Sequence, residues 1–253
     1  MGGLGTRLRP SVKDVPKPMA DIGGKPFMEY LLKYVSAQGI EEVIISCGYK
    51  HEVIVDYFKD RFGSLKILYS IENEPLGTGG AVKKALEFIT ADIKKYEDLL
   101  ILNGDTFFKI SLKKLYDFHK AKSSDLTIAL KTLKNFDRYG SVKIDRNDKI
   151  IGFAEKKPQK EGCINGGIYL LDKRLTGLIA GRELNLPSVF SFEKDFLEVY
   201  YNYSYKEKSL NFYGLPFNEK TYFIDIGVPS DYEAAKTELP EKNYRLKVFK
   251  FNR

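Results

Sequence analysis

Two acidic residues follow short apolar runs, in a pattern typical of metal ligands. Asp105 comes soon after the apolar run 99–102, and Asp225 closes a second short apolar run. In open α/β sheets, ligands bind outside the carboxyl ends of the strands, so both acids could lie at one sheet edge. Mg²⁺ prefers one or two carboxylates together with phosphate oxygens and water. We therefore predict that Asp105 and Asp225 hold Mg²⁺, with a turn or helix-cap role for Asp105 as the structural alternative.

A glycine-rich stretch and two of the cationic residues in the first 17 positions, Arg7 and Lys17, suit the binding of phosphates. Gly3 and Gly5 let the backbone wrap closely around phosphate oxygens, and Thr6 and Arg7 follow them. Arginine offers a fork of donors to phosphate. Lys17 stands between two prolines, which stiffen the chain and could aim its ammonium group at a reacting phosphate. The third glycine of a dinucleotide fingerprint and the lysine of a P-loop are missing, so an ordinary glycine turn is the alternative.

Two further groups of residues suit a nucleotide base and a sugar phosphate. Gly77 and Thr78 lie in a glycine-rich turn before a helical pattern, where a flat base could lie against the backbone. Lys156 suits a phosphate group, while Glu155 and Asn165 suit sugar hydroxyls. Each of these segments taken alone also has a plain reading as a turn.

Apolar runs of strand length alternate with helical patterns in the first half of the chain, which predicts an α/β fold. We expect a Rossmann-like, mixed but mostly parallel sheet with helices on both faces, extended by antiparallel or mixed strands in the second half. The expected helices are 25–38, 52–62, 79–89, 191–201 and 230–236. The expected strands are 42–47, 66–70, 99–102, 126–130, 141–144, 150–154 and 164–171.

The composition is that of one large α/β domain. The chain has 253 residues, of which 43% are hydrophobic and 30% charged, and its net charge is +7. Lysines are interspersed with acids, so we do not expect nucleic-acid binding. The apolar runs are too short to span a membrane, and two cysteines do not make a disulfide framework, so we expect a cytoplasmic protein. The oligomeric state stays open, and a homo-oligomer is compatible with the sequence.

The ordered set of motifs resembles the sugar-1-phosphate nucleotidyltransferases. The motifs are Gly-Gly-x-Gly-Thr-Arg-Leu (2–8), Lys-Pro-Met (17–19), Leu-Gly-Thr-Gly-Gly-Ala (76–81), Asn-Gly-Asp-Thr (103–106), Glu-Lys (155–156), Asn-Gly-Gly-Ile-Tyr (165–169) and Asp-Ile-Gly (225–227). The longer stretches 14–20, 74–81, 102–108, 136–140 and 222–229 are most similar to the D-glycero-α-D-manno-heptose 1-phosphate guanylyltransferases.

The resemblance implies transfer of a nucleoside monophosphate from an NTP, GTP in the closer family, to a sugar 1-phosphate, with release of pyrophosphate. The product would serve surface polysaccharide synthesis. Mannose- or glucose-1-phosphate enzymes using GTP, dTTP or CTP, a non-catalytic sensor and a truncated inactive remnant stay open as alternatives. The implied roles are triphosphate binding by Gly3, Gly5, Thr6 and Arg7, α-phosphate binding by Lys17, base binding by Gly77 and Thr78, Mg²⁺ binding by Asp105 and Asp225, and sugar-phosphate binding by Gly140, Glu155, Lys156 and Asn165.

The chain departs from the family pattern at its start. Members of the family begin with an apolar strand before the glycine loop, whereas this sequence enters the loop at Gly2. We therefore expect the sheet to lack its first strand and the natural start to lie upstream. We also expect a nucleotidyltransferase domain over 1–238 and a basic tail over 239–253, with no C-terminal β-helix.

Overall fold

The computed structural model describes residues 15–90, 98–181 and 183–241. The chain divides into two compact units. The first contains Met1–Gly77, Asn103–Phe107 and Ile224–Arg253, and the second contains Thr78–Leu102 and Phe108–Phe223. No helix in the described parts of the chain is long and apolar enough to cross a membrane.

The first unit is built on a three-stranded sheet in the order β3-β5-β4. Strands β3 (Glu42–Cys47) and β5 (Leu65–Ile71) are parallel, because helix α2 (His51–Phe58) carries the chain back between them. Strand β4 (Arg61–Phe62) pairs antiparallel with β5. Helix α2 ends earlier than the sequence predicts because Lys59 adopts a left-handed φ of 52°, which leaves the helical path.

Shorter elements complete the first unit. The 3₁₀ turn η1 (Lys17–Met19) is followed by the two-stranded pair β1 (Asp21–Ile22) and β2 (Lys25–Pro26) and then by helix α1 (Phe27–Ser36). Helix α7 (Pro229–Glu241) packs against β1, where the hydroxyl of its Tyr232 donates to the carbonyl of Asp21. The expected boundary of the tail at residue 239 falls inside α7, and residues 242–253 lie outside the described parts.

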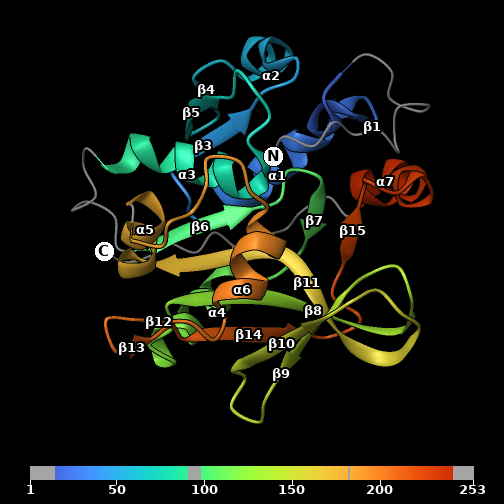
Figure 1. Ribbon diagram of the computed structural model, residues 1–253. Coiled ribbons are helices and arrows are strands. Elements are labelled where there is room, and N and C mark those ends of the chain that lie inside the picture. Colours follow the sequence, from blue (N-terminus) through green and yellow to red (C-terminus); the bar gives the residue numbers. More distant parts are fainter. Residues whose placement is uncertain (1–14, 91–97, 182, 242–253) are drawn as a thin grey trace. The chain divides into compact units, whose positions relative to one another are not determined.

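The second unit is built on a six-stranded mixed sheet in the order β10-β9-β11-β8-β14, with β6 also paired to β11. Figure 1 shows β11, β8 and β14 side by side. Strand β8 is buried along most of its length, as expected for a central strand covered on both faces. The strands are β6 (Asp98–Leu102), β8 (Leu126–Phe136), β9 (Ser141–Ile144), β10 (Ile150–Ala154), β11 (Gln159–Asp172) and β14 (Phe212–Phe217).

Helices and small strand pairs surround this sheet. Helix α4 begins at a serine cap: the Ser111 hydroxyl accepts from the backbone N–H of Lys114, and α4 then packs against β8, β11 and β14. Helix α4 spans Leu112–Ala121, and the other elements of this unit are α3 (Gly77–Thr90), α5 (Lys173–Ala180), the π-helical segment η3 (Phe192–Leu197), α6 (Glu198–Tyr200) and the pair β12 (Ser204–Tyr205) and β13 (Lys208–Ser209). Strands β7 (Thr106–Phe108) and β15 (Phe223–Asp225) pair with each other, and most of their residues belong to the first unit.

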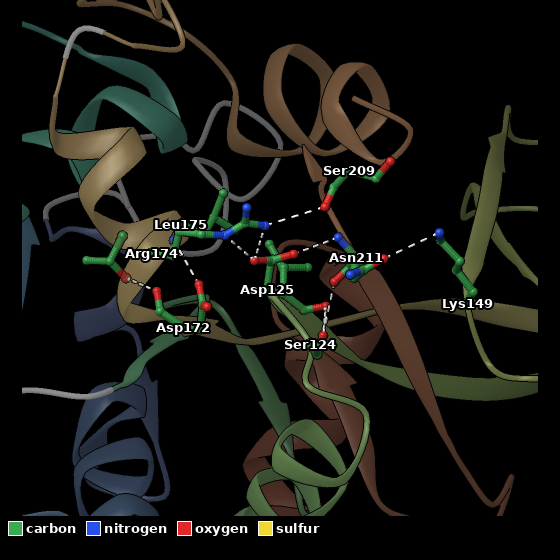
Figure 2. A network of polar contacts seen from close by, with 10 residues as sticks. Ser124, Asp125, Lys149, Asp172, Arg174, Leu175, Ser209 and Asn211 are labelled. Atoms are coloured by element: carbon green, nitrogen blue, oxygen red, sulfur yellow. Dashed lines mark hydrogen bonds and ion pairs between the residues drawn. The ribbon is translucent and has the colours of Figure 1, made fainter. Parts of the chain in front are cut away.

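A polar network joins three segments of the second unit where β8 and β14 begin and β11 ends (Figure 2). The buried carboxylate of Asp125 accepts from Nε of Arg174 at 2.8 Å and from the backbone N–H of Asn211 at 2.8 Å. The carboxylate of Asp172 caps α5 by accepting from the N–H of Leu175 at 2.7 Å. The network therefore holds the register of the parallel pair β8–β14 against the end of β11.

The α/β fold with mixed sheets and helices is confirmed, but parallel pairing is less frequent than expected. Strands β3–β5 and β8–β14 pair in parallel, whereas β1–β2, β12–β13 and the pairs that β4, β6, β9 and β10 make with their neighbours are antiparallel, as is β8–β11. The physical reason is that consecutive strands of the second half follow one another directly, without the crossover helix that parallel neighbours need. Strand β14 was not expected from the sequence.

Candidate active site

Three of the predicted site residues lie together in the first unit. The Nζ atom of Lys17 is 3.5 Å from Oδ2 of Asp105. Asp225 lies within the electrostatic reach of both residues: burial, and after it the charge of Asp105, raise the pKa of Asp225, while the positive charge of Lys17 opposes them. One ammonium group thus faces two carboxylates, one of which is partly withdrawn from water.

Backbone contacts explain why these side chains meet. The N–H of Ile226 donates to the carbonyl of Asp105 at 3.0 Å, so the segment after β15 is bonded to the segment before β7. Gly227 donates its N–H to Oδ1 of Asp225 at 2.8 Å. A Cβ atom at Gly227 would lie 2.9 Å from that oxygen and 3.3 Å from Nζ of Lys17, so a side chain there would crowd the cluster.

The two carboxylates have the donor chemistry of a divalent cation site. Asp225 has a raised pKa because its charge is partly buried beside that of Asp105, and a cation between the two would relieve this repulsion. No group of three or more His, Cys, Asp or Glu in the described residues could hold a metal ion. A cation held by Asp105 and Asp225 would therefore need phosphate oxygens and water as further ligands, as Mg²⁺ does.

A buried acid that was not expected from the sequence, Glu72, lies beside the loop expected to hold a base. Gly77 adopts a φ of 71°, which allows the chain to turn into α3. Glu72, just beyond β5, is 5% exposed, and its Oε2 accepts from the N–H of Leu76 at 3.2 Å. Its Oε1 is buried and has no hydrogen-bond partner among the described residues. A buried, half-unsatisfied carboxylate beside this loop is a candidate acceptor for a ligand.

Thr78 lies in the first turn of α3 and belongs to the second unit. Its Oγ1 accepts from the backbone N–H of Phe192 at 2.8 Å and donates to Oε2 of Glu193 at 2.8 Å. The hydroxyl is therefore fixed in orientation by the start of η3. Glu193 is a second acid that the sequence analysis did not single out, because on a helical pattern it is indistinguishable from a solvated residue.

Asn165 is positioned by an irregularity in β11. The pairing of β11 with β8 shifts register between Asn165 and Tyr169. Nδ2 of Asn165 donates to the Tyr169 hydroxyl at 2.9 Å, and its Oδ1 accepts from the N–H of Gly167 at 2.9 Å. Gly167 has a φ of 72°, and a Cβ at Gly166 would lie 2.6 Å from the carbonyl of Ala129. Both glycines are therefore needed for the bulge that orients the amide.

The other expected sugar-phosphate residues lie near the β9–β10 pair. Gly140 directly precedes β9, and a Cβ there would lie 2.8 Å from the carbonyl oxygen of Ala154. Glu155 and Lys156 follow β10 and are exposed, without a hydrogen bond or ion pair to a described residue. Burial and then the charge of Glu155 raise the pKa of Glu198, which places Glu155 close to α6. Both exposed side chains can therefore reach a ligand.

The predicted triphosphate loop cannot be placed. Gly3, Gly5, Thr6 and Arg7 all lie outside the described residues. Their proposed role in binding the triphosphate therefore stays a prediction from the sequence.

Comparison with known proteins identifies the family. The family model described as nucleotidyl transferase matches residues 1–242. The chain belongs to the nucleotidyl transferase family. It is 47% identical over 239 residues to a D-glycero-alpha-D-manno-heptose 1-phosphate guanylyltransferase of Aneurinibacillus thermoaerophilus, covering 94% of this chain and 96% of that protein. It is 49% identical over 231 residues to the enzyme of the same name from Campylobacter jejuni, covering 91% and 94%.

A solved structure resembles this nucleotidyl transferase over nearly the same length. HddC from Yersinia pseudotuberculosis, complexed with GMP-PN, matches with a TM-score of 0.76 and 38% identity, covering 94% of this chain and 96% of that protein. In this nucleotidyl transferase, the cluster of Lys17, Asp105 and Asp225 is chemically suited to phosphate groups and a divalent cation. The ammonium group of Lys17 can bind phosphate oxygens, and the two carboxylates can bind the cation.

Proposed function

We propose that this nucleotidyl transferase transfers GMP from GTP to D-glycero-α-D-manno-heptose 1-phosphate and releases pyrophosphate. The observation that carries the proposal is the cluster of Lys17, Asp105 and Asp225, whose charges suit a triphosphate with its divalent cation. The two relatives of that name, at 47% and 49% identity over nearly the whole chain, support the choice of both substrates.

In the proposed reaction, an oxygen of the sugar phosphate attacks the α-phosphorus of GTP. A bond forms between this oxygen and the α-phosphorus, and the bond from the α-phosphorus to the bridging oxygen breaks on the opposite side. Pyrophosphate leaves with the electron pair of that bond. A phosphate dianion is already a nucleophile, so the protein needs no general base. Its contribution is to align the two substrates and to stabilise the charge that moves onto the leaving group.

The charged residues have complementary roles in this proposal. The ammonium group of Lys17 and the guanidinium group of Arg7 stabilise negative charge on the α-phosphate and on pyrophosphate as it leaves. Asp105 and Asp225 would hold Mg²⁺ through their carboxylate oxygens. When bound, Mg²⁺ supplies charge neutralisation and Lewis acidity to the phosphate oxygens. Asp105 is also paired with Lys17, so the same carboxylate orients the lysine.

The base is read by the loop around Gly77 and Thr78, together with Glu72. Guanine presents two neighbouring N–H donors at its N1 and N2 positions, and a carboxylate is an acceptor-only group. Oε1 of Glu72 is buried without a partner among the described residues, so it can accept from such a donor. Adenine presents an acceptor at N1, which a carboxylate would repel. This complementarity supports GTP as the substrate.

The sugar 1-phosphate is held by residues of the second unit. Lys156 binds its phosphate, and Glu155 and Asn165 bind sugar hydroxyls. The exposed side chains of Glu155 and Lys156 and the oriented amide of Asn165 support these roles. Gly140 has no Cβ, so the chain at this position can lie close to the carbonyl oxygen of Ala154. The triphosphate is wrapped by the backbone at Gly3, Gly5 and Thr6.

The setting of the reaction follows from its substrates. GTP is a cytoplasmic metabolite, so we infer a cytoplasmic enzyme whose product serves surface polysaccharide synthesis. The sequence-based boundary at residue 238 falls inside α7, and the family model matches residues 1–242, so we assign the activity to the region that includes all of α7. The basic residues after it have no part in the proposed chemistry.

Pyrophosphate release with Mg²⁺ tests the proposal, measured for GTP, ATP, CTP and dTTP against heptose, mannose and glucose 1-phosphates. Release confined to GTP with the manno-heptose 1-phosphate is the expected result. Release with another pair would support the same type of reaction but show that the substrates are different from those proposed. A folded protein that binds GTP but releases no pyrophosphate with any pair would contradict the enzymatic function and favour a nucleotide-sugar sensor.

A further inference from the structure

The carboxylate of Glu193, in η3, accepts hydrogen bonds from two residues at different proposed sites. Thr78 is assigned to base binding, and Tyr169 is hydrogen-bonded to Asn165 of the sugar-phosphate site. Its Oε2 accepts from Oγ1 of Thr78 at 2.8 Å. Its Oε1 accepts from the hydroxyl of Tyr169 at 3.3 Å. Ser191 also donates to Oε2, at 3.3 Å. All of these residues belong to the second unit, so the contacts lie within one compact body.

The contact through Tyr169 continues to Asn165. The Tyr169 hydroxyl accepts from Nδ2 of Asn165 at 2.9 Å while donating to Glu193. A hydroxyl has one proton, so donation to Glu193 leaves its lone pairs facing the Asn165 amide. The carboxylate of Glu193 therefore determines the direction of the Tyr169 hydroxyl, which in turn favours one orientation of the Asn165 amide.

The segment that carries Glu193 is packed closely against the start of α3. The N–H of Gly79 donates to the carbonyl of Phe190 at 2.9 Å. A Cβ at Gly79 would lie 2.1 Å from the Phe190 ring, so only glycine permits this approach. The Phe192 ring meets the Tyr169 ring edge-on at a centroid distance of 5.2 Å. Both contacts of Glu193 are thus supported by packing on either side.

The charge of Glu193 is satisfied by hydroxyl groups. Among the described residues, no ion pair to Glu193 is formed, whereas Thr78, Tyr169 and Ser191 all direct hydroxyl groups at it. A hydrogen bond to a charged group is stronger than one between neutral groups. This makes a single carboxylate an effective means of ordering several neutral side chains at once.

We propose that Glu193 is a positioning residue that holds Thr78 and, through Tyr169, Asn165 in one arrangement, so that the base site and the sugar-phosphate site are set together. The inference rests on the roles of Thr78 and Asn165 in the proposed function. Groups that bind substrate act most effectively when neighbouring hydrogen bonds hold them in place. Loss of the carboxylate releases both groups, so it weakens the binding of both substrates.

The test compares Glu193→Ala, Glu193→Gln and Tyr169→Phe with the wild-type protein. Each variant is titrated calorimetrically with a non-hydrolysable GTP analogue and with D-glycero-α-D-manno-heptose 1-phosphate, and the KM of both substrates is measured by pyrophosphate release. Glu207→Gln is the matched control, because Glu207 is exposed in the turn between β12 and β13 of the same unit. Thermal unfolding reports the stability of every variant.

Glu193→Ala is expected to raise the Kd and KM of both substrates about tenfold, the loss expected for a hydrogen bond to a charged group. Glu193→Gln has one acceptor oxygen, so it restores one of the two affinities. Tyr169→Phe is expected to weaken the binding of the sugar phosphate and to leave the binding of the GTP analogue unchanged. This variant serves as the probe if Glu193→Ala does not fold. Glu207→Gln is expected to match the wild type.

Unchanged affinities in Glu193→Ala, with lower thermal stability alone, would overturn the positioning role. So would unchanged affinity for the sugar phosphate in Tyr169→Phe. Failure of the proposed function is a separate result: a wild type that binds both ligands but releases no pyrophosphate. The calorimetric differences would then still decide the role of Glu193. A wild type that binds neither ligand would overturn both proposals.

Discussion

The ammonium nitrogen of Lys17 lies 3.5 Å from a carboxylate oxygen of Asp105, and the two side chains are 23% and 26% exposed. An ion pair that remains open to solvent contributes little to stability. Its importance lies in placing a cation beside two carboxylates, since Asp225 also senses the charges of both residues.

Replacing Lys17 with methionine is therefore expected to remove activity rather than stability. Loss of one charged contact to the reacting phosphates should lower kcat roughly 10²–10³-fold. The melting temperature should change little. Lys66→Met is the control, because Lys66 forms an exposed ion pair of 2.7 Å with Glu42 in the same unit. A Lys17→Met protein with near-normal kcat would contradict the assignment.

Asp225 makes the cation site testable by thermal unfolding. A ligand that binds only the folded protein raises its melting temperature. Mg²⁺ added to protein that already contains a GTP analogue should therefore raise the melting temperature of the wild type further. This further increase should be lost in Asp225→Asn and in Asp105→Asn. EDTA should stop pyrophosphate release by the wild type, and Mg²⁺ should restore it. Asp56→Asn, at an exposed acid of α2, should respond to Mg²⁺ as the wild type does. An equal increase in all four proteins would place the cation elsewhere.

Glu72 is expected to select guanine. Glu72→Gln replaces one acceptor oxygen with a donor, so kcat/KM for GTP should fall roughly 10–100-fold, as expected for loss of a charge-assisted hydrogen bond. The value for ATP should not fall, because adenine offers an acceptor at N1. Glu74→Gln is the control, since Glu74 is exposed two residues away. Parallel losses for GTP and ATP in Glu72→Gln would point to a structural role instead.

Gly140 and Gly152 form a matched pair for testing the sugar-phosphate site. A Cβ at Gly140 would lie 2.8 Å from the carbonyl oxygen of Ala154, whereas a Cβ at Gly152 would meet nothing within 4 Å. Gly140→Ala should therefore displace the chain next to Glu155 and raise the KM of the sugar 1-phosphate, roughly tenfold if one hydrogen bond is lost. The KM of GTP should stay unchanged. Equal KM values in Gly140→Ala and Gly152→Ala would remove this loop from the site.

Asp98 is expected to stabilise the second unit in a pH-dependent way. Burial by itself raises the pKa of Asp98, but the nearby cationic groups outweigh it and lower the pKa below its usual 3.8: Nε2 of His119 lies 3.7 Å and Nζ of Lys120 2.5 Å from its carboxylate oxygens. A lowered pKa means that the folded protein binds fewer protons than the unfolded chain, so this stabilisation is full above pH 3.8 and is lost as the pH falls through the folded-state pKa.

Asp98→Asn should therefore lose stability at neutral pH, by about 1 kcal/mol because solvent around Lys120 screens the pair. Its unfolding free energy should also depend less on pH below 3.8 than that of the wild type. Urea unfolding across this pH range measures both effects. Asp117→Asn, at an exposed ion pair with Lys113, is the control. A wild type and an Asp98→Asn protein with parallel pH profiles would refute the prediction.

Local patterns predicted much of the secondary structure and brought forward the residues of the candidate site. The run before Asn103 is β6, the glycine-rich segment from Gly77 begins α3, and the second-half strands are β8 to β11. These succeed because apolar periodicity and glycine act within a few residues. Glu72 and Glu193 were not predicted, because nothing in the local sequence distinguishes them from ordinary exposed acids. Glu72 directly follows a strand and Glu193 lies in the first turn of a helical segment, and exposed acids are common at both kinds of position.

The sequence by itself determined which chemical groups were available: acids at 105 and 225 that follow or close short apolar runs, a lysine between prolines, and an asparagine before two glycines. Only the tertiary structure decided which of them meet. Asp105 and Asp225 come together through the bond from Ile226 to the carbonyl of Asp105, and Asn165 is joined to Thr78 through Tyr169 and Glu193. Such contacts join segments far apart in the chain, so they depend on strand pairing and packing, and no local pattern of residues encodes them.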